Sequence, residues 1–321
     1  MPKSTNPETT TGTSARPQLF VGKAGPGVKK TDPILIADNV TRNFGGMTAV
    51  DVDHVEIPRG AITALIGPNG AGKTTLFNLL TGFDRPTTGT WQFDGISLAG
   101  MPAYKVARTG MVRTFQLTKA LGLLSVLENM RLGATKQSGE HFFTALISSL
   151  WRKRERDITA QAMELLARFK LDSKASDYAA SLSGGQRKLL EMARALMTVP
   201  RLVMLDEPMA GVNPALTQSL LGHILNLKTE GMTVLFVEHD MHMVQTIADW
   251  VIVMAEGKIV AEGYPDEVMR DTAVIDAYLG AHHDTDLGSL TGQLEVAKEL
   301  GDEFLVSEIS DEIEEEPKSG K

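Results

Sequence analysis

Residues 67–74 read Gly-Pro-Asn-Gly-Ala-Gly-Lys-Thr, a spacing that suits phosphate binding. Glycines let the backbone N–H groups of such a loop turn toward phosphate oxygens, and the helix that follows adds the positive end of its dipole. Lys73 would place a charge on the outer phosphates, and the Thr74 hydroxyl would be a magnesium ligand. The alternative is an ordinary glycine-rich turn.

Two adjacent acids, Asp206 and Glu207, follow the apolar run at 202–205. A nucleotide bound with magnesium needs an acid at the end of a strand beside the phosphate loop. Asp206 would hold Mg²⁺ through water, and Glu207 would polarise the attacking water as a general base. The plainer interpretation is that both residues cap a strand end.

A second glycine pair lies in Leu182-Ser-Gly-Gly-Gln186. Ser183 and Gln186 have the spacing of a capping box, and the helix that they would open has an apolar face. This face comprises Leu189, Leu190, Ala193, Leu196 and Met197. The segment could simply be a well-capped helix start. The exposed N–H groups of Gly184 and Gly185 could instead form a second anion-binding site.

Strand-length apolar runs and helical patterns alternate along the middle of the chain. Strands are expected at 34–40, 50–57, 61–66, 202–205 and 233–237, and helices at 76–80 and 215–229. This alternation predicts an α/β fold with a parallel sheet. The first two strands flank the Gly45–Gly46 break, and residues 251–261 favour an antiparallel hairpin turning at Glu256–Gly257. Residues 117–197 are predicted to form an inserted helical subdomain.

Three regions of different composition divide the 321 residues. Residues 1–33 are rich in Thr, Pro, Gly and Lys and are expected to be flexible, and residues 34–283 are expected to fold as one domain. Residues 284–321 contain twelve acids against three lysines, a net charge of −9, and are predicted to be largely disordered. Residues 34–283 have a net charge of −2, which indicates no nucleic-acid partner.

Several classes of protein are excluded by composition. The chain contains no cysteine, which rules out a disulfide scaffold, a thiolate metal site and a cysteine nucleophile. No stretch of 18 apolar residues is present to span a membrane as a helix. The N-terminus lacks the apolar core of a signal peptide, so the protein is expected to stay where it is made.

The phosphate loop, Leu182–Gln186 and Leu205-Asp-Glu207, in that order, resemble the ATP-binding cassette (ABC) ATPases over about residues 34–280. The resemblance implies a P-loop cassette with a mixed parallel core sheet, an N-terminal antiparallel β subdomain and an inserted helical subdomain. It also implies that Leu182–Gln186 of one subunit closes over the γ-phosphate held by the phosphate loop of the other subunit. The spacing of the motifs alone does not distinguish this arrangement from closure within a single chain. The ATP-binding residues would be Gly67, Pro68, Asn69, Gly70, Ala71, Gly72, Lys73, Thr74, Thr75, Ser183, Gly184, Gly185 and Gln186.

The same resemblance gives roles to isolated residues. Gln116 matches the glutamine that touches Mg²⁺ and couples to a membrane partner, and His239 matches the histidine that contacts the γ-phosphate. Phe44 matches the aromatic that stacks on adenine, although a phenylalanine at a strand end could equally be core. Asn213 stands where many members have aspartate in the dimer-contact loop, which puts that contact in doubt.

Longer stretches resemble the ATPases of bacterial branched-chain amino acid importers. They are residues 44–50, 67–83, 113–116, 128–134, 207–214, 237–241 and 274–280. The implied partners are a second ABC ATPase, two membrane permeases and an external substrate-binding protein, with this chain peripheral at the cytoplasmic face of the membrane. Urea or amide importers and lipopolysaccharide-export ATPases are the alternatives. Two-cassette translation factors, coiled-coil chromosome ATPases and non-hydrolysing sensors fit less well.

Overall fold

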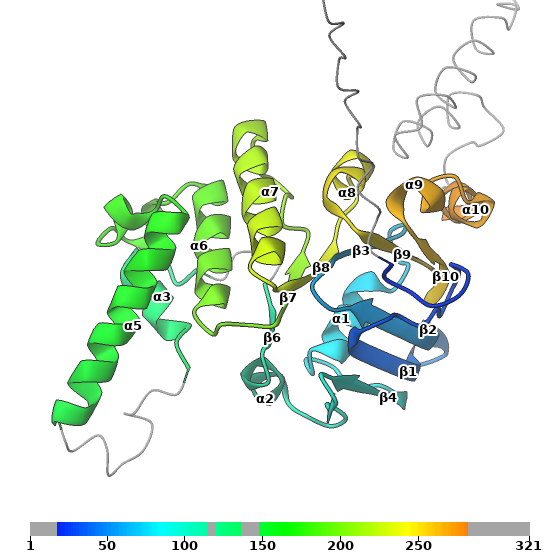
Figure 1. Ribbon diagram of the computed structural model, residues 1–321, viewed down its shortest axis with the longest axis horizontal. Helices are drawn as coiled ribbons and strands as arrows, with labels where there is room; N and C mark the ends of the chain where they lie inside the picture. Colours follow the sequence, from blue (N-terminus) through cyan, green and yellow to red (C-terminus); the bar gives the residue numbers. More distant parts are fainter. Residues whose placement is uncertain (1–17, 115–119, 136–147, 282–321) are drawn as a thin grey trace, which may run out of the picture.

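The structure, a computed structural model, describes residues 18–114, 120–135 and 148–281 (Figure 1). Its strands are β1 Pro33–Phe44, β2 Met47–Pro58, β3 Ile62–Ile66, β4 Thr88–Phe93, β5 Ile96–Ser97, β6 Met111–Arg113, β7 Leu202–Asp206, β8 Thr233–Val237, β9 Trp250–Ala255 and β10 Lys258–Gly263. Its α-helices are α1 Lys73–Leu80, α2 Ala103–Arg108, α3 Val126–Leu132, α5 Ser148–Arg168, α6 Gly184–Leu196, α7 Pro214–Thr229, α8 Met241–Ile247, α9 Pro265–Val268 and α10 Thr272–Ala281. Two 3-10 turns, Asp172–Lys174 and Ala179–Ser181, complete the described elements.

Six strands form the central sheet in the order β10-β9-β3-β8-β7-β6. The pairs from β9 to β6 are parallel, and only β10 runs antiparallel. Every residue of β3, β7 and β8 is buried, as expected for strands covered on both faces. The hairpin of β9 and β10 turns at Glu256 and Gly257, which both have positive φ. The predicted parallel sheet and hairpin are therefore confirmed.

A smaller antiparallel sheet has the order β2-β1-β4-β5. β1 and β2 pair along almost their whole length around the predicted break at Gly45–Gly46. Apolar side chains of α1 pack in one cluster with this sheet and with one face of the central sheet. The helix that follows the phosphate loop is thus held between the two sheets (Figure 1).

The opposite face of the central sheet is covered by helices from other parts of the chain. Side chains of α3, α5, α6, α7 and α8 share one apolar cluster with Ile62, Val203 and Phe236 of the sheet. The described part of the predicted helical subdomain contains α3, α5 and α6 (Figure 1). Alternate residues of each buried strand therefore belong to two different cores.

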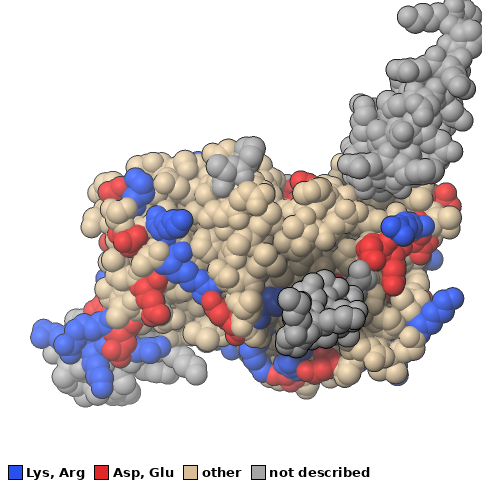
Figure 2. Space-filling view, turned by 45° about the horizontal axis from the view of Figure 1, so that its top comes forward, with Lys and Arg blue, Asp and Glu red and all other residues tan. Residues whose placement is uncertain are grey.

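One end of the helical subdomain is basic. Arg152, Lys153 and Arg156 are exposed near the start of α5, and Figure 2 shows basic side chains gathered at this end of the molecule. An open groove of about 810 Å³ runs beside them, lined in part by Arg131 and Thr159. No helix of the described residues is both long enough and apolar enough to cross a membrane.

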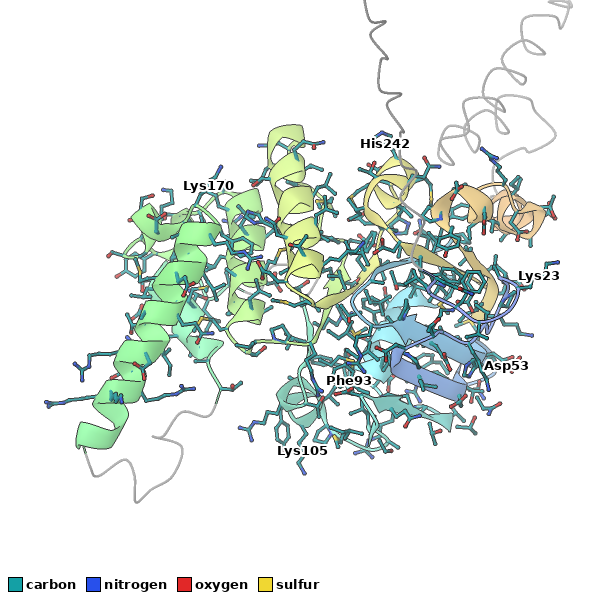
Figure 3. The ribbon with its side chains drawn as sticks, viewed as in Figure 1. Lys23, Asp53, Phe93, Lys105, Lys170 and His242 are labelled. Atoms are coloured by element: carbon teal, nitrogen blue, oxygen red, sulfur yellow. The ribbon has the colours of Figure 1, made fainter. Side chains whose placement is uncertain are left out.

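The expectation that residues 1–33 are flexible is wrong for residues 18–32. Phe20 packs on Trp250, with ring centroids 4.9 Å apart, and on Tyr264 at 5.8 Å. Lys30 is buried, and its Nζ lies 2.5 Å from Oε2 of Glu262. The exposed Lys23 lies at the outer edge of this segment (Figure 3). These contacts join residues more than 200 positions apart, so no local pattern could reveal them. The tail at 284–321 lies outside the described residues.

Lys30→Met should destabilise the fold by about 3 to 5 kcal/mol, because it leaves the buried Glu262 carboxylate without its cation. Adding Glu262→Gln should recover much of this loss, since the unpaired charge is then removed. Chemical denaturation measures both, with the exposed neighbour Lys29→Met as the control. Equal losses for the two lysine variants would contradict a structural role for the ion pair.

Candidate active site

The phosphate-loop sequence lies between β3 and the start of α1, the position that anion binding requires. A Cβ at Gly67 would lie 2.0 Å from the carbonyl oxygen of Met254, and one at Gly72 would lie 2.5 Å from that of Ala49. Both glycines also have positive φ. The loop is thus pressed against strands of both sheets, which permits glycine alone at these two positions.

Lys73 is buried in this loop, with 6% of its surface exposed. Its Nζ donates to the carbonyl oxygens of Gly67 at 2.5 Å and Pro68 at 2.9 Å. Burial lowers the pKa of Lys73 to about 8, although the nearby Glu207 and Asp206 carboxylates favour its charged form. The ammonium group of the loop and the two acids therefore occupy one electrostatic neighbourhood.

Strand order explains how these groups meet. β3, β8 and β7 are adjacent and parallel, so their carboxyl ends lie along one edge of the sheet. The phosphate loop follows β3, His239 follows β8, and the Asp206–Glu207 pair ends β7. Ligand sites in open α/β sheets lie at this edge.

Glu207 and His239 are in direct contact. Oε1 of Glu207 lies 3.0 Å from Nε2 of His239. The backbone of Glu207 is in the left-handed region, with φ of 46°, and its N–H donates to the carbonyl oxygen of Val237 at 3.0 Å. A left-handed conformation is costly for a residue with a side chain, and such residues concentrate at functional sites. The fold therefore holds the Glu207 carboxylate beside the histidine ring at a cost in backbone strain.

Asp206 is buried and lies against a cation that the sequence analysis did not place in the site. Arg113 of β6 donates to Oδ2 of Asp206 at 2.6 Å and to Oδ1 of Asn78 in α1, also at 2.6 Å. Among the described residues, Oδ1 of Asp206 accepts no hydrogen bond. This free oxygen and the exposed Thr74 hydroxyl are hard oxygen donors of the kind that Mg²⁺ prefers.

The Leu182–Gln186 segment opens α6 with both bonds of a capping box. Oγ of Ser183 accepts from the N–H of Gln186 at 3.2 Å, and Oε1 of Gln186 accepts from the N–H of Ser183 at 3.0 Å. Its two glycines differ in surroundings. A Cβ at Gly185 would lie 1.9 Å from Cδ2 of Leu216, whereas one at Gly184 would meet nothing within 4 Å. Packing therefore explains the glycine at position 185, whereas none of the described residues requires a glycine at position 184.

The remaining predicted residues are distributed as follows. Phe44 lies at the end of β1 and is 46% exposed, with the Arg42 guanidinium 4.3 Å from its ring centroid, so it is not a core residue. Asn213 caps α7, because its Oδ1 accepts from the N–H of Leu216 at 2.9 Å. Thr75 lies half-buried in α1. Gln116 falls outside the described residues.

Three further residues of the site had no predicted role. Arg113 binds Asp206, and Lys188 of α6 donates to the carbonyl oxygen of Glu207 at 3.0 Å. Glu238 accepts from the N–H of Met209 at 2.9 Å and from that of His239 at 3.3 Å. Of these three residues, only Glu238 had a signal in the sequence, because it immediately precedes His239. Arg113 and Lys188 come from distant parts of the chain.

A phosphate loop after one strand, with an acid pair and a histidine after its neighbours, defines an ATP-binding cassette. A model of the ABC transporter family matches residues 50–210, and one for branched-chain amino acid ATP-binding cassette transporters matches residues 258–284. The chain is 40% identical over 248 residues to a probable branched-chain amino acid transport ATP-binding protein, LivG, of Archaeoglobus fulgidus. That match covers 77% of this chain and 96% of the relative.

Another relative and a solved structure support the same family assignment. The high-affinity branched-chain amino acid transport ATP-binding protein BraF of Pseudomonas aeruginosa is 40% identical over 250 residues, which is 77% of this chain and 98% of BraF. A nucleotide-free ATP-binding cassette from an ABC transporter superposes with a TM-score of 0.67 at 36% identity and covers 77% of this chain and 98% of its own. The chain therefore belongs to the ABC transporter ATPases, which hydrolyse ATP to power transport.

Gly185→Ala should destabilise the fold by about 1 to 3 kcal/mol, because its methyl group overlaps Leu216. Gly184→Ala should change stability by less than about 1 kcal/mol, since alanine favours a helix and the position is open. Chemical denaturation of the matched pair measures the difference. Adding Leu216→Ala to the Gly185 variant should relieve the overlap, and equal effects of the two glycine substitutions would refute this packing argument.

Proposed function

We propose that this chain is the ATP-hydrolysing subunit of an importer for branched-chain amino acids or a related small polar solute. The observation that carries the chemistry is the 3.0 Å contact between Glu207 and His239 beside the phosphate loop. The transport of branched-chain amino acids named for the relatives supports the substrate class. Two permeases, an external binding protein and the cytoplasmic face of the membrane complete the proposed assembly.

In this proposal Glu207 is the general base and His239 contacts the γ-phosphate. The Glu207 carboxylate accepts a proton as the water oxygen attacks the γ-phosphorus and the bond to ADP breaks. Lys73 binds the outer phosphates, and Phe44 stacks on adenine with the ring face that Arg42 leaves open. Residues 67–75, which are the phosphate loop and Thr75 of α1, surround the phosphates in this proposal.

Thr74 and Asp206 would hold Mg²⁺, with Gln116 as a further ligand outside the described residues. Bound Mg²⁺ neutralises charge on the phosphate oxygens. Arg113 occupies Oδ2 of Asp206 and so fixes the carboxylate with Oδ1 available. A water-mediated contact to the metal suits this arrangement, because the carboxylate already has a charged partner.

The two glycine-rich segments support closure between two subunits. Apolar side chains of α1, which follows the phosphate loop, pack on one face of the central sheet, and those of α6 pack on the other. We propose that Ser183–Gln186 of a second ABC ATPase supplies the cover for ATP bound here. The open space around Gly184 is consistent with a nucleotide from another subunit.

Glu207→Gln should lower kcat by roughly 100- to 10,000-fold, because the general base loses its charge. ATP affinity should survive, since Lys73, Thr74 and Asp206 remain. Uncleaved ATP should then hold two cassettes together. Size-exclusion chromatography with light scattering, alone and with the partner ATPase, detects this association.

The exposed Glu164→Gln is the matched control and should turn over ATP as the wild type does. If Glu207→Gln binds ATP but never changes mass in its presence with either partner, the two-subunit site is misassigned. Undiminished hydrolysis by this variant would instead remove Glu207 from its proposed role.

ATP affinity should weaken roughly tenfold between pH 7 and pH 9, because a lysine with a pKa of about 8 loses its proton over this range. The charged form binds phosphate, so affinity is highest below the pKa and falls above it. Titration with a fluorescent ATP analogue measures the trend. Lys73→Arg stays charged and should show a flat profile, and a flat wild-type profile would contradict the role of Lys73.

A further inference from the structure

Helix α6, here called the signature helix, joins the Leu182–Gln186 segment, here called the signature segment, to the proposed catalytic base of the same chain. Ser183 caps the helix, and Lys188 lies in its second turn. Nζ of Lys188 donates to the backbone carbonyl oxygen of Glu207 at 3.0 Å. This contact joins a side chain of α6 to the backbone of the proposed catalytic base. Lys188 itself lies outside both the Leu182–Gln186 and the Leu205–Glu207 motifs.

The peptide groups on both sides of Glu207 are thereby fixed. Its N–H donates to the carbonyl oxygen of Val237, and its carbonyl oxygen accepts from Lys188. A residue with φ of 46° returns to a more favourable conformation unless its neighbours prevent it. The Lys188 contact therefore opposes rotation of the peptide group that would turn the Glu207 carboxylate away from His239.

Lys188 lies in an acidic surrounding that holds it in place. Burial lowers the pKa of Lys188, while the carboxylates of Glu238, Glu191 and Glu207 favour its charged form. Glu191, one turn further along α6, is buried, and Lys188 and Glu191 both line a small cavity with Pro208. A lysine in such a setting has little freedom to move independently of its helix.

Glu238 fixes the other side of the same contact. Its carboxylate is buried and accepts backbone N–H groups from Met209, two residues after Glu207, and from His239. The segment after β7 and the segment after β8 are therefore tied together. A displacement of Glu207 relative to α6 would therefore disturb the Lys188 contact.

We propose that Lys188 is a positioning residue that transmits the state of the signature helix to Glu207 in the same chain. The proposal rests on the proposed function, in which the α6 N-terminus binds the γ-phosphate held by the partner subunit. Engagement of that phosphate moves or stiffens α6. Lys188 passes the change to Glu207, so occupancy of one nucleotide site adjusts the general base of the other.

The test is a double-mutant cycle on the full chain with its partner ATPase, using Lys188→Met and Glu207→Gln. Lys188→Met keeps an unbranched side chain of nearly the same length but cannot donate to the carbonyl oxygen. We expect kcat to fall at least about tenfold with KM and ATP affinity unchanged. In the Glu207→Gln background the Lys188 substitution should lower the residual rate no further, because Lys188 acts through Glu207.

ATP-dependent association of the Glu207→Gln protein should persist when Lys188→Met is added, because the phosphate contact of α6 is intact. Loss of this association would show that Lys188 serves the signature segment directly and would overturn the proposal. Equal fold-losses of kcat in both backgrounds would indicate a general structural role and would also overturn it. Lys105→Met, on the exposed surface of α2 (Figure 3), is the control and should change nothing.

Lys188→Leu, which is apolar and cannot donate a hydrogen bond, replaces Lys188→Met in the cycle if the methionine variant does not fold. Lys188→Arg should retain most of the activity, since it keeps a cation that can donate. A wild-type protein without ATPase activity would refute the proposed function. An active wild-type protein whose kcat is matched by both Lys188→Met and Lys188→Leu would refute only the role of Lys188.

Discussion

The structure depends on three short parallel strands that are buried on both faces. β3, β7 and β8 each have five residues, all buried, and their ladder hydrogen bonds fix their relative register. Such strands cannot slip without exposing backbone groups or apolar side chains. The residues that follow them are consequently held at one edge of the sheet, where Lys73, Glu207 and His239 meet.

Charges at this edge are stabilised by specific partners, because the surrounding protein has a low dielectric. Asp206 is paired with Arg113, and the Lys73 ammonium contacts loop carbonyl oxygens. The buried Glu238 has a raised pKa because of its burial, while two backbone N–H groups favour its charged form. The site is thus a connected polar network in which moving one group disturbs several others.

The two apolar cores explain how one sheet can serve two sites. One core joins α1 to the antiparallel sheet, and the other joins α6 to α3, α5 and the opposite face of the central sheet. Residues 18–32 add to the first core through Phe20 and Lys30, at the Trp250 end of the sheet. α1 and α6 therefore lie on opposite faces of the sheet, the arrangement on which the proposed two-subunit site is based.

The sequence by itself determined the phosphate loop, the strand that precedes it, the acid pair and the α6 capping box. These features depend on neighbouring residues, whose types fix the local backbone. Tertiary structure alone decided the partners of those residues: Arg113 for Asp206, Lys188 for the Glu207 carbonyl group, and Glu262 for Lys30. The last pair joins positions 232 residues apart, and such contacts arise from strand order and burial, which no local spacing records.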